Sequence, residues 1–461
     1  MARLRYVSRF ILLAMLAGVV WLLAWQPSPP VPEQRRNDVV VQYWEKWTGV
    51  EQDAIQQIVD DFNDTVGKEK HIYVDMLSMS NIDQKTLVAT AAGEPPDVAG
   101  LWDTKIPQFG ELGALTPLDD MAAAHGITAG YYKPVYWRGC HYNGHLYSLV
   151  STPATIALFY NTKIFHENAA ELRAAGLDPD RAPRTLHELD RYASVLNTFK
   201  IGPDGRKHLD RAGYIPMLPG WYITDMPIWF GADEWDEKTK RFTLTDPGVI
   251  AAFNWIQSYS IKLGADAVTE MQTSQGGFNS VENEFIAGTV AMEMQGPWMA
   301  NYIHHWKPEM DHDWAAAPFP SAVGQKLVTY APFDALAIPV GAKHKKEAFE
   351  FIAYINRQDV MEKLCMLHCK NSPLAKVSNY FLTHHPNPYI RVFEELAWSP
   401  NAHITMQCPI ASEAGQELLA LAQGVVALQL DPETALREAQ VRLQARYDDF
   451  EAKQKIRQRD R

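Results

Sequence analysis

Aromatic residues lie directly beside carboxylate residues at the ends of two predicted strands. Trp44-Glu45 follows a β-branched run at 39–41, and Trp102-Asp103 follows a short apolar run at 97–101. Aromatic faces pack against the C–H surfaces of sugars, while carboxylates accept hydrogen bonds from hydroxyl groups. The combination favours a carbohydrate site. The alternatives stay open for each pair, because the rings could complete a core and the carboxylates could be solvated loop residues.

Three further aromatic positions follow the same logic. Trp221 opens the segment 221–230, which holds four aromatic residues, and Trp298 follows a predicted strand at 289–294. Phe333-Asp334 lies between two short strands that we expect within 327–340. Fourteen tryptophans are present in the chain, so several of them must serve the core. For Trp221 the sequence favours neither role.

The elements that would position these residues begin at Val39. A strand that begins with the β-branched residues 39–41 leads into a helix, for which Thr48 and Glu51 have the spacing of a capping box. The apolar side chains of that helix recur at steps of three and four residues, which places them on one buried face: Ala54, Ile55, Ile58, Val59 and Phe62. In open α/β sheets, ligands bind where such strands end.

The rest of the chain continues the α/β pattern. A second strand at 72–77 completes a right-handed β-α-β unit, and a helix at 82–92 precedes the third strand. Asn143-Gly144 predicts a hairpin, and Thr185 with Glu188 predicts a capped helix reaching Asn197. Helices are expected to dominate after 345. A chain of 461 residues is too long for one core, so we expect two or three lobes.

The sequence gives little support for catalysis, metal binding or nucleic-acid binding. It has no nucleophile elbow, Walker loop, dinucleotide turn or HExxH motif, and its net charge is -12. We therefore expect no cofactor and no catalytic residue. The four cysteines, Cys140, Cys365, Cys369 and Cys408, allow up to two disulfides of undetermined pairing. Cys365 and Cys369 also have a spacing that suits a metal, with buried free thiols as the other alternative.

The N-terminus has the features of an export segment. Arg3, Arg5 and Arg9 precede an apolar run from Phe10 to Trp25, so residues 1–26 are expected to be a signal peptide or an N-terminal membrane anchor. Residues 27–38 contain four prolines and form a predicted spacer. The protein is then periplasmic or extracytoplasmic, either free or anchored to the inner membrane.

Six segments, taken in order, resemble blocks of the solute-binding proteins of ABC importers, in the sugar-binding group that includes the maltose-binding protein. They are VVVQYWEKWTGVEQDAIQQIVDDFN, AAGEPPDVAGLWDTKIPQFGELGALTPLDD, GHLYSLVSTPATIALFYNTKIF, RTLHELDRYASVLN, FIAGTVAMEMQGPWM and EAFEFIAYINRQDVMEKL. The resemblance implies an α/β periplasmic-binding-protein-like fold with hinge strands and a ligand cleft between two lobes. It implies one lobe from 39–151 and 329–370, and another from 152–328 and 371–461.

The resemblance also implies the residues of the cleft and the function. The matching cleft positions are Trp44, Glu45, Trp102, Asp103, Thr152, Trp221, Trp298, Phe333 and Asp334. We expect a monomeric binding protein that delivers an oligosaccharide to the membrane subunits of an ABC importer. One alternative is a membrane-anchored sugar sensor for a signalling partner. Another is a glycan-active enzyme that uses Glu45 and Asp103 as paired carboxylates.

Overall fold

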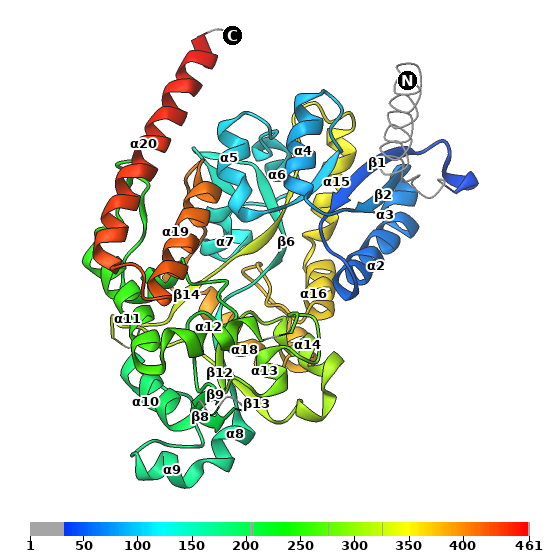
Figure 1. Cartoon of the computed structure of the whole chain (residues 1–461). Coiled ribbons are helices and arrows are strands. Elements are labelled where there is room, and N and C mark those ends of the chain that lie inside the picture. The colour runs from blue at the N-terminus through cyan, green and yellow to red at the C-terminus, as the bar shows by residue number, and fades with distance from the viewer. Residues whose placement is uncertain (1–31, 203–204, 206, 275, 325, 460–461) are drawn as a thin grey trace, which may run out of the picture.

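The computed structural model describes residues 32–459, except 203–204, 206, 275 and 325. The expected export segment at 1–26 and the first part of the proline-rich spacer, 27–31, lie outside the described residues. The remainder of the chain folds into two α/β lobes, arranged one above the other in the view of Figure 1.

A five-stranded sheet forms the centre of the first lobe. Its strands are β1 (Val39–Glu45), β2 (Ile72–Ser78), β3 (Val98–Trp102), β6 (Ser148–Pro153) and β15 (Phe333–Ala337), in the order β2-β1-β3-β15-β6. The strands β1, β2 and β3 are parallel, and β15 runs antiparallel to both β3 and β6. The helices around the sheet are α2 (Val50–Asp64), α3 (Val66–Lys70), α4 (Ile82–Ala91), α5 (Ile106–Glu111), α6 (Asp119–Ala124), α7 (Pro134–Gly139), α15 (Lys345–Ile355) and α16 (Gln358–Leu367).

Helix α2 has the buried face that its sequence predicts. Ala54, Ile55, Ile58, Val59 and Phe62 are all buried, and the Phe62 ring packs on Phe351 of α15 with centroids 5.2 Å apart.

The predicted capping box at the start of α2 is wrong. The N-cap residue is Gly49, which has a φ of 60° and no side chain to accept a hydrogen bond. Because Gly49 adopts this positive φ, the helix begins at Val50, one residue later than a Thr48 cap would place it.

A three-stranded antiparallel sheet forms the centre of the second lobe, in the order β12-β7-β13. Its strands are β7 (Ala157–Asn161), β12 (Met292–Gln295) and β13 (Trp314–Ala317). The larger helices of this lobe are α8 (Thr162–Glu167), α9 (Ala169–Ala174), α10 (Leu186–Leu196), α11 (Pro247–Leu263), α12 (Ala265–Thr273), α14 (Met299–Trp306), α19 (Ala411–Val426) and α20 (Pro432–Arg459). The Thr185 hydroxyl accepts a hydrogen bond from the Glu188 amide at 3.0 Å, which confirms the predicted cap of α10.

Short elements complete the chain. The hairpins are β4 (His141–Tyr142) with β5 (His145–Leu146), β8 (Thr198–Ile201) with β9 (Lys207–Arg211), and β10 (Trp235–Asp236) with β11 (Arg241–Phe242). The first of these turns at Asn143-Gly144, as predicted. Strand β14 (Val328–Tyr330) pairs with β16 (Asn401–His403). The remaining short helices are η1 (Glu33–Arg35), η2 (Asp103–Lys105), η3 (Ala129–Tyr131), η4 (Met226–Phe230), α13 (Glu284–Ala287), η5 (Pro308–Met310), α17 (Asn379–His384) and α18 (Ile390–Ala397).

Two chain segments cross side by side from one lobe to the other. One runs from β6 to β7 and the other from β14 to β15, and the Ala154 amide donates to the Pro332 carbonyl at 2.8 Å. The Ile156 amide likewise donates to the Tyr330 carbonyl at 3.0 Å. Paired crossing strands of this kind allow two rigid lobes to rotate about a short hinge.

The four cysteines are free and buried, so neither of the two possible disulfides is present. No helix in the described part of the chain is both long and apolar enough to span a bilayer.

Candidate functional site: the cavity between the lobes

A cavity of about 1210 Å³ lies where the crossing segments meet the strand ends of the first lobe. It exceeds the roughly 300–1,000 Å³ that is usual for small-molecule pockets, so it has room for a ligand of several units. The first lobe contributes Trp47, Glu51, Trp102 and Asp103, and the second contributes Trp221, Tyr222, Asp225, Phe278, Trp298 and Tyr302. Thr152, Tyr330, Phe333, Asp334 and Lys370 line it near the crossing.

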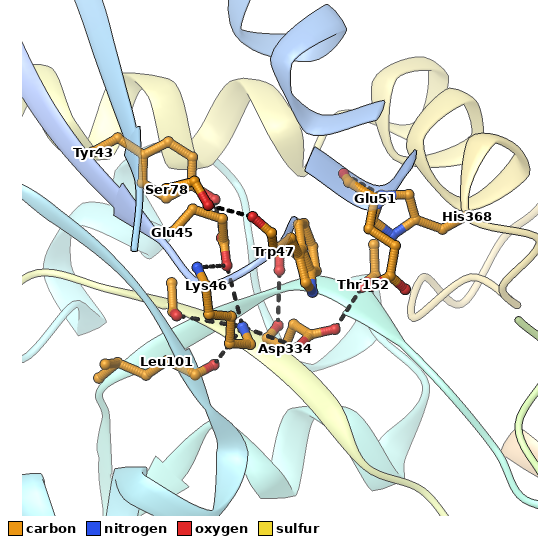
Figure 2. Close-up of polar contacts among 12 residues, drawn as sticks. Tyr43, Glu45, Lys46, Trp47, Glu51, Ser78, Leu101, Thr152, Asp334 and His368 are labelled. Atoms are coloured by element: carbon orange, nitrogen blue, oxygen red, sulfur yellow. Dashed lines mark hydrogen bonds and ion pairs between the residues drawn. The ribbon is translucent and has the colours of Figure 1, made fainter. Parts of the chain in front are cut away.

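A buried network of charged groups forms one side of this cavity (Figure 2). Asp334 lies at its centre: its Oδ1 is 3.0 Å from Lys46 Nζ, and its Oδ2 is 3.0 Å from Lys370 Nζ. The Thr152 hydroxyl also donates to Oδ2, at 2.8 Å. Burial alone would raise the pKa of Asp334, but the two ammonium groups hold it well below its usual range. Asp334 is therefore an ionised carboxylate whose charge is fully compensated.

Lys46 connects this network to the strands behind it. Its Nζ donates to the carbonyl oxygens of Gly100 and Leu101, each at 3.3 Å, and lies 3.4 Å from Glu45 Oε1. The Glu45 side chain in turn accepts from the Tyr43 hydroxyl. A Cβ at Gly100 would lie 2.1 Å from Glu45 Oε2, so only glycine leaves room for that carboxylate.

Aromatic rings from both lobes cover the rest of the cavity surface. Trp102 is 47% exposed and Trp221 is 46% exposed, which is unusual for such large apolar side chains. Trp221 packs on Phe278 at 4.5 Å between centroids, and Phe278 packs on Tyr302 at 4.7 Å. Lys46 Nζ lies 4.6 Å from the centre of the Trp102 ring, a cation–π distance. The rings are thus held in place while their outer faces remain available.

Trp47 is oriented by a buried histidine. The His368 ring contacts Trp47 edge-on at 4.6 Å between centroids, and its Nε2 lies 3.1 Å from the Glu51 carbonyl oxygen. Burial lowers the pKa of His368 to about 3, so the ring is neutral at physiological pH. His368 therefore acts as a positioning residue for the tryptophan.

The site and the fold together agree with the comparisons to known proteins. The family of bacterial extracellular solute-binding proteins matches residues 57–375, which is more than half of the 461-residue chain. The chain belongs to this family. The family places this solute-binding protein outside the cytoplasm.

Known relatives of this solute-binding protein include a maltotriose-binding protein of Pyrococcus abyssi, which is 22% identical over 299 residues. That match covers 62% of this chain and 56% of the relative, so the chain spans about half the length of the curated relative.

Two solved structures share its fold. CpMnBP1 with mannobiose bound has 24% identity and a TM-score of 0.75, covering 88% of this chain and 99% of CpMnBP1. The sugar-binding protein MalE from Xanthomonas citri has 20% identity and a TM-score of 0.73. The match covers 90% of this chain and 98% of MalE. Both likenesses confirm the two-lobed fold expected from the sequence.

Most of the residues singled out in the sequence of this solute-binding protein meet in the cavity. Those that line it are Trp102, Asp103, Thr152, Trp221, Trp298, Phe333 and Asp334. They come from segments up to about half the chain apart, which only the two-lobed fold brings together.

Trp44 and Glu45 do not line the cavity of the solute-binding protein. Strand β1 ends at Glu45, and the chain continues to Trp47 before an aromatic ring reaches the cavity. Glu45 is fully buried behind Lys46. The paired carboxylates of the enzyme alternative, Glu45 and Asp103, are therefore not placed together around the ligand space.

Several cavity residues of this solute-binding protein were not predicted as ligand contacts. Trp47 and Asp225 lie within the ring-rich segments that the sequence marked, so local composition could have found them. Glu51 was predicted to cap helix α2 instead. No motif or aromatic run in the neighbouring sequence marks Glu234 or Lys370 as a cavity residue. Within the described residues, no group of three or more His, Cys, Asp or Glu side chains could hold a metal ion.

Proposed function

We propose that this solute-binding protein captures an oligosaccharide between its lobes and delivers it to the membrane subunits of an ABC importer. The observation that carries the proposal is that two exposed tryptophans from different lobes, Trp102 and Trp221, line the same cavity of about 1210 Å³. Flat aromatic faces on two sides suit a chain of sugar rings, and the polar groups of the cavity suit its hydroxyls.

The relatives support a carbohydrate ligand. One is a maltotriose-binding protein, and CpMnBP1 binds both mannobiose and mannotriose. At 25% identity, the mannotriose complex aligns with 88% of this chain at a TM-score of 0.74.

Binding would close the lobes about the crossing segments. In this proposal the lobes are 39–151 with 329–370, and 152–328 with 371–461. The closed form is what a membrane partner would distinguish from the empty form. The protein would act as a monomer and without catalysis, and residues 1–26 would export it or tether it to the inner membrane.

Titration of the purified protein tests the proposal. We expect heat release and a change in tryptophan fluorescence with at least one member of a panel of malto-, manno- and cello-oligosaccharides. Silence across the panel would count against a sugar ligand.

A pair of tryptophan variants locates the site. Trp102→Ala and Trp221→Ala should each weaken binding about tenfold or more, a loss of about 1.4 kcal/mol, because each removes a stacking face. Trp398→Ala is the matched control, since Trp398 is 50% exposed and does not line the cavity. If all three variants bind the sugar as tightly as the parent protein does, the ligand binds elsewhere.

A further inference from the structure

Helix α14 carries three aromatic side chains at steps of four residues: Trp298 at its N-cap, then Tyr302 and Trp306. Side chains four residues apart lie on the same face of a helix, with about 5–6 Å between their Cβ atoms. Trp298 and Tyr302 line the cavity, whereas Trp306, one turn beyond Tyr302, does not. The aromatic face of α14 therefore runs from inside the cavity to a tryptophan outside it.

A loop follows the same face of the helix. The Phe278 ring packs on Tyr302 with centroids 4.7 Å apart, and on Trp221 with centroids 4.5 Å apart. The next residue, Asn279, accepts a hydrogen bond on its Oδ1 from Trp306 Nε1 at 2.9 Å. Consecutive residues of the loop thus contact consecutive turns of α14. These contacts connect four rings in one series, which we call the α14 track: Trp221, Phe278, Tyr302 and Trp306.

Trp306 presents carbon surface to the solvent. The residue is 38% exposed, and its one polar atom, the indole nitrogen, already donates to Asn279. The His305 ring contacts the indole edge-on at 4.9 Å between centroids, so two neighbours hold the ring in place. Isolated exposed apolar side chains are normal on protein surfaces. Trp306 differs from those because its contacts continue the series of rings that lines the cavity.

We propose that Trp306 forms an outer subsite, which binds the part of an oligosaccharide that extends out of the cavity along α14. This inference rests on the proposed sugar-binding function and adds the size class of the ligand, a linear chain long enough to reach from the cavity to Trp306. Affinity then increases with chain length, because each further sugar ring gains contact with the α14 track.

The occupant of the outer subsite is the end of the same sugar chain whose inner rings lie in the cavity. The C–H face of a sugar ring matches a flat carbon surface whose only polar atom is already bonded. A protein partner fits less well, because a stable protein–protein interface buries roughly 800 Å² on each side and Trp306 exposes only part of one side chain.

Oligosaccharides of graded length test the inference. Linear malto-, manno- and cello-oligosaccharides, from the disaccharide to the hexasaccharide, are titrated into the protein by calorimetry. Within a series that binds, we expect the hexasaccharide to bind at least about threefold tighter than the shortest member that binds. This comparison alone does not separate the outer subsite from the cavity, so variants of Trp306 complete the test.

Trp306→Ala should weaken binding of the hexasaccharide about three- to tenfold and that of the shortest member less than about twofold, because only the longer chain reaches the outer subsite. Trp306→Phe retains a ring face and should recover most of the loss. Trp398→Ala is the matched control, since Trp398 is 50% exposed and does not line the cavity. Urea denaturation of each variant establishes that it is folded.

The outcomes separate the inference from the proposed function. If Trp306→Ala binds every length as the parent does, or loses the same factor at every length, the outer subsite is overturned and sugar binding in the cavity stands. An affinity that does not rise with length in the parent, or no recovery in Trp306→Phe, overturns it in the same way. If the parent binds no member of any series, the proposed function itself is overturned.

Discussion

Asp334 and Asp103 lie side by side in the same cavity, and each is 4% exposed. Asp334 of β15 lies opposite Trp102 of β3, and Asp103 directly follows Trp102 in the chain. Yet their pKa values move in opposite directions. That of Asp334 is held well below its usual range, whereas burial and the neighbouring Asp334 charge raise the pKa of Asp103 to about 8.

The difference comes from the partners and not from burial depth. Asp334 has two ammonium groups and a hydroxyl, whereas Asp103 has one backbone amide and a like charge beside it. A compensated carboxylate stabilises the fold, while an uncompensated one is available to a ligand. Asp334 therefore stabilises the fold, and we propose that Asp103 at the adjacent position contacts the ligand.

The largest expected effect follows from removing Asp334. Asp334→Ala would leave Lys46 and Lys370 buried without their shared counterion, so the free energy of unfolding should fall by about 3–5 kcal/mol. Urea denaturation measures this. Asp103→Ala, at equal exposure, is the control and should cost far less; similar losses in both variants would contradict the division of roles.

A smaller effect is expected at Thr152, which donates to Asp334 and accepts from Lys370 Nζ at 3.0 Å. Thr152→Val keeps the shape but removes the hydroxyl, and hydrogen bonds to charged groups contribute about 1.5–3 kcal/mol. We expect a loss of unfolding free energy in that range, again by urea denaturation. Thr152→Ser, which retains the hydroxyl, should recover most of it, and an equal loss in both variants would assign the effect to packing.

A third effect is a dependence of the unfolding free energy on pH, and it has opposite signs at the two aspartates. Folded Asp103 holds its proton up to a pKa of about 8, against an ordinary value of 3.8, so between these values the folded state binds more protons than the unfolded state. Its contribution therefore destabilises the fold as pH rises, by at most about 1.4 kcal/mol per pH unit. Asp334, with a lowered pKa, contributes stability that is lost as pH falls below the ordinary value.

Asp103→Asn tests this slope. The difference in unfolding free energy between the variant and the parent should grow in favour of the variant as pH rises from about 4 to about 8. Denaturation at several pH values measures it. A difference that does not vary with pH would mean that Asp103 is ionised in the folded protein.

Local sequence patterns predicted the elements well. Alternating and helical periodicities located β1, α2, β2 and α10, because each pattern reflects burial within its own element. The capping box at Thr48 failed because the left-handed Gly49 decides where α2 begins, and a motif search cannot foresee that conformation.

The cavity was predictable only in part. Trp102 and Asp103 lie at the end of a buried strand, and the apolar run before them allowed this position to be predicted from the sequence. Trp44 was predicted as the cavity residue instead of Trp47, because no residue pattern in the sequence marks where β1 ends. Lys370 enters from a loop more than 300 residues after Lys46, and only the folded chain shows that both ammonium groups share Asp334.

The free cysteines have a practical consequence for observing closure. All four are buried, and burial raises the thiol pKa values of Cys140, Cys369 and Cys408 to about 12, which leaves almost no reactive thiolate. Fluorophores could thus be attached at two introduced surface thiols, Val88→Cys and Ile261→Cys, whose parent side chains are 68% and 66% exposed. Energy transfer between the dyes would follow the separation of the two lobes in a single molecule as a ligand is added.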